Sequence, residues 1–230
     1  MWIKICGITR IEDAHAVADA KASAIGLNFF PGSKRYVSTK QATEILSSLR
    51  QHEGNGRPLD VVGVFVNSNV DEVVAIASQL ALTAVQFHGD ETISSIASFH
   101  QLMPQTRIIR AVRVSMDRIK DCLAELDLLQ REVPLSACLL DAFVANEFGG
   151  TGARIDLRVA ERYLSEARPP LIIAGGLTPL NVADVVLAAR PWGVDTASGV
   201  ESSPGIKDQD LVLKFVDQAS LSKSDSPSRL

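Results

Sequence analysis

The chain has 230 residues, of which 46% are hydrophobic and 22% are charged, and its formal net charge is −4. These values are typical of a globular protein with a sizeable core, and they exclude disorder for most of the chain. A net negative charge provides no basic surface field, so neither nucleic acid nor an acidic membrane is expected as a partner. No apolar run approaches the length of a membrane-spanning helix, and the first residues lack the apolar stretch of a signal peptide. A cytoplasmic location is therefore expected.

The three cysteines, Cys6, Cys122 and Cys138, show no C-x-x-C spacing. An odd number of cysteines without this spacing fits neither a disulfide framework nor a zinc site. Cys138 lies inside an apolar run and Cys122 in a helical pattern, so both are interpreted as packing residues. No set of histidine, aspartate and glutamate residues has the spacing of metal ligands, so no metal is expected.

Eight short apolar runs recur along the chain and are predicted to be strands. They cover residues 2–8, 24–30, 60–66, 83–88, 107–114, 137–143, 171–176 and 192–198. Between them, apolar residues recur at i, i+3, i+4 and i+7, which predicts amphipathic helices. Capping residues mark several predicted helix starts: Ser38 or Thr39, Asn69 with Asp71, and Thr178 followed by Pro179 at the first helical position.

Alternation of strands and helices predicts parallel pairing, and near-continuous apolar strands predict a sheet covered on its outer face. Eight such units without an interrupting linker predict an α/β protein with a single (β/α)8 TIM barrel over residues 1–220. A polar segment at 52–58 is predicted to be a connection at the amino-terminal end of the barrel. Residues 221–230 are serine-rich and are predicted to form a flexible polar tail.

Active sites of such barrels lie where the strands end at the carboxyl-terminal face. The last two runs close on glycine-rich turns that contain Gly175, Gly176, Ser198 and Gly199. Glycines next to a helix start let backbone N–H groups approach a phosphate closely, and the helix dipole favours the anion. Glycine also ends strands for steric reasons alone, but its recurrence at the usual phosphate position favours a phosphate site.

Two acid–base candidates are ambiguous on local evidence. Cys6 ends the first run and is followed by Gly7, so its thiol is either a small buried group or a nucleophile or base. Asp141 follows two leucines in the sixth run, and its carboxylate is either a structural acceptor or an acid or base. The residues around each of them leave both readings open.

Two further residues could contact a ligand at this face. Arg35 lies in the turn-rich segment after the second run, where a guanidinium could bind a carboxylate bidentately, although most arginines are surface charges. His88 ends the fourth run, and no other histidine stands at a strand end. It could bind a ligand, act as an acid or base, or pack its ring against substrate.

Taken together, these stretches resemble the phosphoribosylanthranilate isomerase family of tryptophan biosynthesis. The resemblance covers nearly the whole chain and rests on an ordered set of motifs. They are "KICGIT", "GLNFFPGSKRYV", "VGVFVN", "VQFHGDE", "LLDAF" with "GGTG", "AGGL" with "NV", and "GVDTASGVESSPGIKD". Phe87, Ala174, Thr196 and Ala197 depart from the family pattern, so the phosphate turns are expected to donate fewer hydroxyl hydrogen bonds.

The resemblance implies an Amadori rearrangement that needs neither metal nor cofactor. N-(5'-phosphoribosyl)anthranilate would become 1-(2-carboxyphenylamino)-1-deoxyribulose 5-phosphate. Carried over by motif, Cys6 is the general base and Asp141 the general acid, while Arg35 would bind the anthranilate carboxylate. The phosphate would lie on the turns of Gly175–Gly176 and Ser198–Gly199.

The alternatives are another phosphosugar barrel enzyme, such as the aminoaldose isomerase of histidine biosynthesis or indole-glycerol-phosphate synthase, and a non-catalytic barrel that binds a phosphometabolite. The first rival usually has two aspartates in related halves and the second a lysine and a glutamate, and neither set is evident. Loss of Cys6 or Asp141 would favour the non-catalytic barrel, but both residues are present. The expected partner is a small phosphorylated aminosugar, and the chain is expected to be a monomer, with a homodimer as the alternative.

Overall fold

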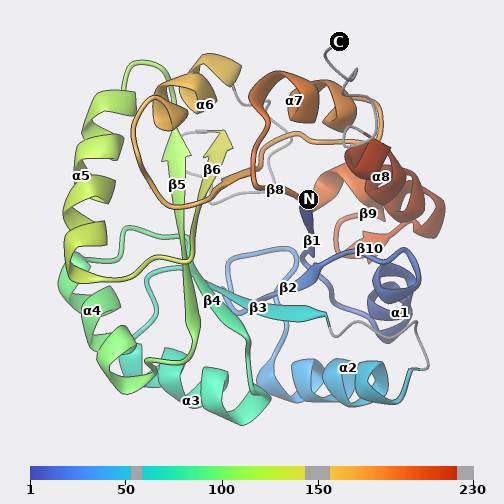
Figure 1. Ribbon diagram of the computed structural model, residues 1–230. Coiled ribbons are helices and arrows are strands. Elements are labelled where there is room, and N and C mark those ends of the chain that lie inside the picture. Colours follow the sequence, from blue (N-terminus) through green and yellow to red (C-terminus); the bar gives the residue numbers. More distant parts are fainter. Residues whose placement is uncertain (53–58, 143–155, 222–230) are drawn as a thin grey trace.

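The structure, a computed structural model, describes residues 1–52, 59–142 and 156–221 (Figure 1). Eight parallel strands form a closed barrel in chain order, and β8 pairs with β1 to complete it. The strands are β1 Trp2–Cys6, β2 Ala24–Asn28, β3 Asp60–Phe65, β4 Ala84–Phe87, β5 Arg107–Val114, β6 Ala137–Ala142, β7 Leu171–Ile173 and β8 Gly193–Thr196. The predicted (β/α)8 barrel is confirmed.

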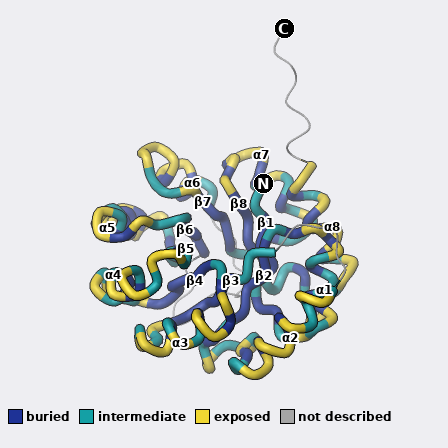
Figure 2. The backbone as a smooth tube through the Cα atoms, turned by 60° about the horizontal axis from the view of Figure 1, so that its bottom comes forward, coloured by how far each residue is buried: buried dark blue, intermediate teal, exposed yellow. Residues whose placement is uncertain are grey.

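A helix follows each strand and covers the outside of the barrel (Figures 1 and 2). The helices are α1 Ile11–Asp19, α2 Thr39–Gln51, α3 Val70–Leu80, α4 Ile93–Leu102, α5 Ile119–Glu132, α6 Leu157–Leu164, α7 Val182–Ala189 and α8 Gln209–Leu221. Between β8 and α8 lie a short 3-10 helix, η1 (Ser198–Val200), and an antiparallel hairpin of β9 (Glu201–Ser203) and β10 (Ile206–Lys207). No described helix has the length and apolarity needed to cross a membrane.

Two predicted helix starts are confirmed. Ser38 caps α2 in a capping box with Gln41, and the Asn69 side chain accepts from the backbone N–H of Asp71 at the start of α3. The predicted start at Thr178 is wrong, because α7 begins only at Val182. The Asn181 side chain accepts from the Thr178 N–H and donates to the Gly176 carbonyl, which stabilises a separate turn before the helix.

The last helix, α8, ends at Leu221, the first residue of the predicted tail. Residues 222–230, and residues 53–58 of the predicted polar connection, lie outside the described part of the chain.

The core has two layers. One lies between strands and helices, and the other fills the barrel with mostly small residues, among them Ala24, Ala84, Ala111 and Ala137. Side chains alternate between the two faces of a strand, so Lys4 and Cys6 point into the barrel with Trp2, which packs against this inner layer. The small inner side chains leave room above them at the carboxyl-terminal face.

Candidate functional site

A pocket opens at the carboxyl-terminal ends of the strands. Its lining is Cys6, Asn28, Ser33, Arg35, Val64, Val66, Gln86, His88, Asp141, Ala174, Gly175, Gly176, Leu177, Asp195, Thr196, Ala197 and Ser198. The structure therefore brings together the thiol and the carboxyl group that the sequence could only list separately. Asp141 and His88 are both buried, with 6% and 8% of their surfaces exposed, so water has little access to either group.

His88 is oriented by Gln86 and directed at Asp141. The Gln86 amide nitrogen lies 2.8 Å from His88 Nδ1, and His88 Nε2 lies 3.5 Å from Asp141 Oδ2. An amide nitrogen only donates hydrogen bonds, so Nδ1 accepts and the proton of the neutral ring is on Nε2. The strand period explains this arrangement, because Gln86 and His88 are two residues apart and share one face.

Cys6 lies beside a buried ion pair of Lys4 and Asp195. Lys4 Nζ is 2.8 Å from Asp195 Oδ1, and the parallel pairing of β1 with β8 places these two residues opposite each other. Burial raises the pKa of the Cys6 thiol and Asp195 acts in the same direction, whereas Lys4 and Lys207 lower it. Burial has the larger effect, so the thiol is mostly protonated at neutral pH despite the nearby cations.

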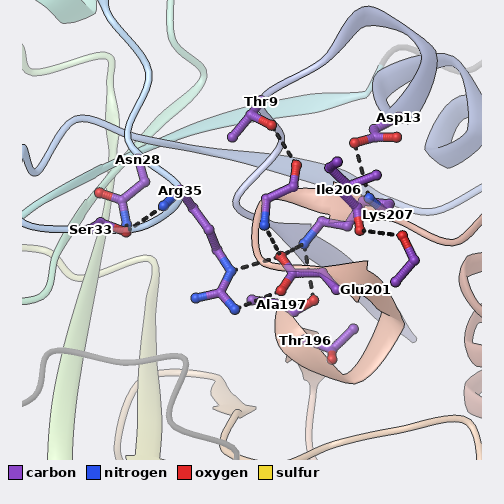
Figure 3. A network of polar contacts seen from close by, with 12 residues as sticks. Thr9, Asp13, Asn28, Ser33, Arg35, Thr196, Ala197, Glu201, Ile206 and Lys207 are labelled. Atoms are coloured by element: carbon purple, nitrogen blue, oxygen red, sulfur yellow. Dashed lines mark hydrogen bonds and ion pairs between the residues drawn. The ribbon is translucent and has the colours of Figure 1, made fainter.

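Arg35 reaches the pocket next to Cys6, but one edge of its guanidinium is occupied. Its Nε and Nη2 each donate to a different oxygen of Glu201 at 2.7 Å (Figure 3). Two of the five N–H donors of the arginine are used in this pair, which leaves three for a ligand. Gly7 makes room for the side chain, since a Cβ there would lie 2.4 Å from Arg35 Cδ.

The two predicted phosphate turns lie side by side. Gly175 and Gly176 have φ of +90° and +61°, conformations that glycine adopts without strain. The Thr196 hydroxyl donates to the Leu177 carbonyl at 2.7 Å and so joins the turn after β8 to the turn after β7. Of the four predicted residues, Gly175, Gly176 and Ser198 line the pocket among the described residues. Gly199 packs under the turn, where a Cβ would meet the Leu177 carbonyl oxygen at 1.8 Å.

Comparison with known proteins now decides the family. The sequence profile of the N-(5'-phosphoribosyl)anthranilate isomerase family matches residues 3–218. A protein of that name from Thiobacillus denitrificans is 39% identical over 220 residues, which are 96% of this chain and 98% of the relative. Another from Pseudomonas fluorescens is 41% identical over 214 residues, 93% of this chain and 95% of the relative.

The chain belongs to the N-(5'-phosphoribosyl)anthranilate isomerase family. A solved family structure from Thermotoga maritima matches with a TM-score of 0.79 at 33% identity, covering 95% of this chain and 98% of that one. A second solved family member, in complex with reduced 1-(o-carboxyphenylamino)-1-deoxyribulose 5-phosphate, matches with a TM-score of 0.73 at 33% identity and the same coverage. Both comparisons agree with the predicted family and the predicted barrel.

Several polar residues in and around the pocket were not predicted from the sequence. Lys4 and Asp195 carried a usable signal, because each is a charged residue inside a short apolar strand and such charges are buried only when paired. Glu201 and Lys207 lie beyond the last predicted strand, and nothing local marked them as neighbours of Arg35. Among the described residues, no group of three or more histidine, cysteine, aspartate or glutamate residues could hold a metal ion. The predicted "GGTG" segment lies outside the described residues.

Proposed function

We propose that this chain isomerises N-(5'-phosphoribosyl)anthranilate to 1-(2-carboxyphenylamino)-1-deoxyribulose 5-phosphate in tryptophan biosynthesis. The observation that carries the proposal is the pocket itself. Cys6 and Asp141 line it together, and two glycine turns and an arginine stand around it. An acid and a base between two anion-binding groups suit an aminoaldose that has a carboxylate at one end and a phosphate at the other.

Asp141 acts first, as the general acid. It protonates the furanose ring oxygen, the bond from that oxygen to C1' breaks, and the lone pair of the anthranilate nitrogen forms the iminium. The buried position of Asp141 strengthens its electrostatic interactions with the substrate. His88, held by Gln86, lies beside this carboxyl group, with its Nε2 3.5 Å from Asp141 Oδ2.

Cys6 then acts as the general base and takes the proton from C2', which the adjacent iminium makes acidic. The electron pair of the C2'–H bond forms the C1'=C2' double bond and the iminium electrons return to nitrogen, and the resulting enolamine loses its 2'-hydroxyl proton and gains a proton at C1' as it becomes the ketone. C2' is oxidised and C1' is reduced within one molecule, so atoms and electrons balance without a co-reactant. The iminium charge favours the thiolate at the moment when the base is needed, and Lys4 and Lys207 act in the same direction.

The anion-binding groups place the sugar between the acid and the base. The guanidinium of Arg35 binds the anthranilate carboxylate with the donors that Glu201 leaves unused. Backbone N–H groups of the turns at Gly175–Gly176 and Ser198–Gly199 bind the phosphate. Positioning of this kind supplies a large part of the rate gain of an enzyme.

A fluorescence assay with freshly made phosphoribosylanthranilate tests the proposal. Wild type should consume the substrate, whereas Asp141→Asn should lose activity about 10²- to 10⁴-fold because an amide cannot donate the acidic proton. A wild-type protein that turns over only the aminoaldose of histidine biosynthesis, or neither sugar, would contradict the proposed function. The monomeric state remains a prediction, which sedimentation velocity can test.

A further inference from the structure

We propose that Glu201 is a positioning residue that fixes the spacing between the two anion-binding groups of the pocket, Arg35 and the turn after β8. This inference rests on the proposed function, because it assumes a substrate with a carboxylate and a phosphate. Glu201 begins β9, directly after the 3-10 helix that starts at Ser198. It is therefore connected along the chain to the phosphate turn, and through its side chain to Arg35 (Figure 3).

The Glu201 carboxylate is saturated with donors. Its Oε1 accepts from Arg35 Nε at 2.7 Å, Lys207 Nζ at 2.9 Å and the Gly205 backbone N–H at 3.2 Å. Its Oε2 accepts from Arg35 Nη2 at 2.7 Å. Burial raises the pKa of Glu201, but Arg35 and Lys207 together lower it by more. The pKa of Glu201 therefore lies below its ordinary value, and the group remains ionised. A buried carboxylate held by four donors, two of them from one guanidinium, is fixed in place and acts as a structural anchor.

Lys207 extends the same network to the phosphate turn. Its ammonium donates to the Ala197 carbonyl at 3.0 Å as well as to Glu201, and the side chain is fully buried. Its backbone N–H donates to Asp13 in α1, which holds β10 against the barrel. One continuous set of charge-assisted hydrogen bonds therefore runs from Arg35 through Glu201 and Lys207 to Ala197, whose neighbour Ser198 lines the pocket.

The ion pair of Arg35 with Glu201 also determines which edge of the guanidinium a ligand can contact. The bidentate contact fixes the guanidinium plane on one side, and the close packing of Arg35 Cδ over Gly7 fixes the aliphatic part on the other. Without the Glu201 charge, two cations, Arg35 and Lys207, would be left close together and would repel each other. The guanidinium would then move away from the orientation in which it meets a carboxylate.

The test compares Glu201→Gln with wild type in turnover and in calorimetric binding of reduced 1-(o-carboxyphenylamino)-1-deoxyribulose 5-phosphate. We expect KM and the Kd of this analogue to rise about 10- to 100-fold, the worth of one or two charge-assisted hydrogen bonds, while kcat changes by less than about threefold. If Glu201→Gln does not fold, Glu201→Asp replaces it, because the shorter side chain keeps the charge but cannot contact both nitrogens.

Asp127→Asn is the matched control. Asp127 forms the same kind of bidentate pair with Arg168, at 2.9 Å for both contacts, on the outside of the barrel. Both variants should lower the unfolding midpoint, but only Glu201→Gln should weaken analogue binding. Equal effects of the two variants on Kd would show a general loss of rigidity and would overturn the inference.

A double-mutant cycle with Arg35→Ala shows whether Glu201 acts through Arg35. In the Arg35→Ala background, Glu201→Gln should change the Kd of the analogue by less than about twofold, because the group it positions is gone. Additive effects would overturn the inference, as would a Glu201→Gln variant with unchanged KM and Kd. A wild-type protein without isomerase activity would instead contradict the proposed function, so the two failures are distinguishable.

Discussion

Polar side chains at the two ends of the barrel differ in whether they have hydrogen-bond partners within the chain. At the amino-terminal end, Asp60 accepts from Trp2 Nε1 at 3.0 Å and pairs with Arg107, and Trp2 stacks on Trp192. At the carboxyl-terminal end, two buried polar atoms of neighbouring side chains, Gln86 Oε1 and His88 Nε2, have no aligned hydrogen bond among the described residues.

This difference in hydrogen bonding indicates that polar groups at the amino-terminal end stabilise the fold, whereas those at the carboxyl-terminal end act on a ligand. A buried polar group without a good hydrogen bond costs about 1–3 kcal/mol, so such groups are kept only where they have another use. Side chains at the amino-terminal end find their partners within the chain, and their loss should affect stability alone. Side chains at the carboxyl-terminal end should affect turnover more than stability.

The largest expected effect comes from comparing two cysteines at different depths. Cys6→Ser should lower kcat about 10²- to 10⁴-fold, because a serine hydroxyl ionises far less readily than a thiol and so does not supply the anionic base. Cys138→Ser is the control. Cys138 packs in the layer between strands and helices, where burial raises its pKa to about 12, so its replacement should cost stability and leave kcat unchanged. Stopped-flow kinetics and urea unfolding measure both, and an unaltered kcat in Cys6→Ser would refute its role as the base.

A smaller effect is expected at the opposite end of the barrel. Asp60→Ala removes the acceptor of Trp2 Nε1 and the partner of Arg107, which should lower the free energy of unfolding by about 1–2 kcal/mol. Urea denaturation measures this loss, and kcat and KM should stay at their wild-type values. A drop in kcat comparable with that of Cys6→Ser would contradict the inference that polar residues at the amino-terminal end affect stability alone.

The smallest effect is the dependence of kcat/KM on pH. Burial raises the pKa of Cys6 above its ordinary value, and the base form is the thiolate, so the active fraction of free enzyme grows as pH rises. We expect kcat/KM to increase from neutral pH to about pH 9, through the range where thiols titrate. Labelling of Cys6 by iodoacetamide should follow the same rise. A residual kcat/KM of Cys6→Ser that rises in the same way over this range would show that the thiolate of Cys6 is not the base.

Much of the candidate site could be predicted because several of its residues stand at the ends of strands. Cys6, His88 and Asp141 each close or nearly close an apolar run, and parallel strands of a closed barrel present those ends at one face. The position of Arg35 could be predicted in the same way, but its partner could not. Arg35 and Glu201 are 166 residues apart in the sequence. No local sequence pattern indicates which charged side chains form an ion pair between such distant segments.

The amino-acid sequence by itself determined the barrel, its strand order and the face that bears the site, because hydrophobic periodicity and chain order are local properties. Only the tertiary structure decided which charges are paired: Lys4 with Asp195, Arg35 with Glu201, and His88 directed at Asp141. It also decided that burial outweighs the nearby cations at Cys6. Electrostatic energies depend on distance and solvent exposure, and both are set by residues far apart in the chain.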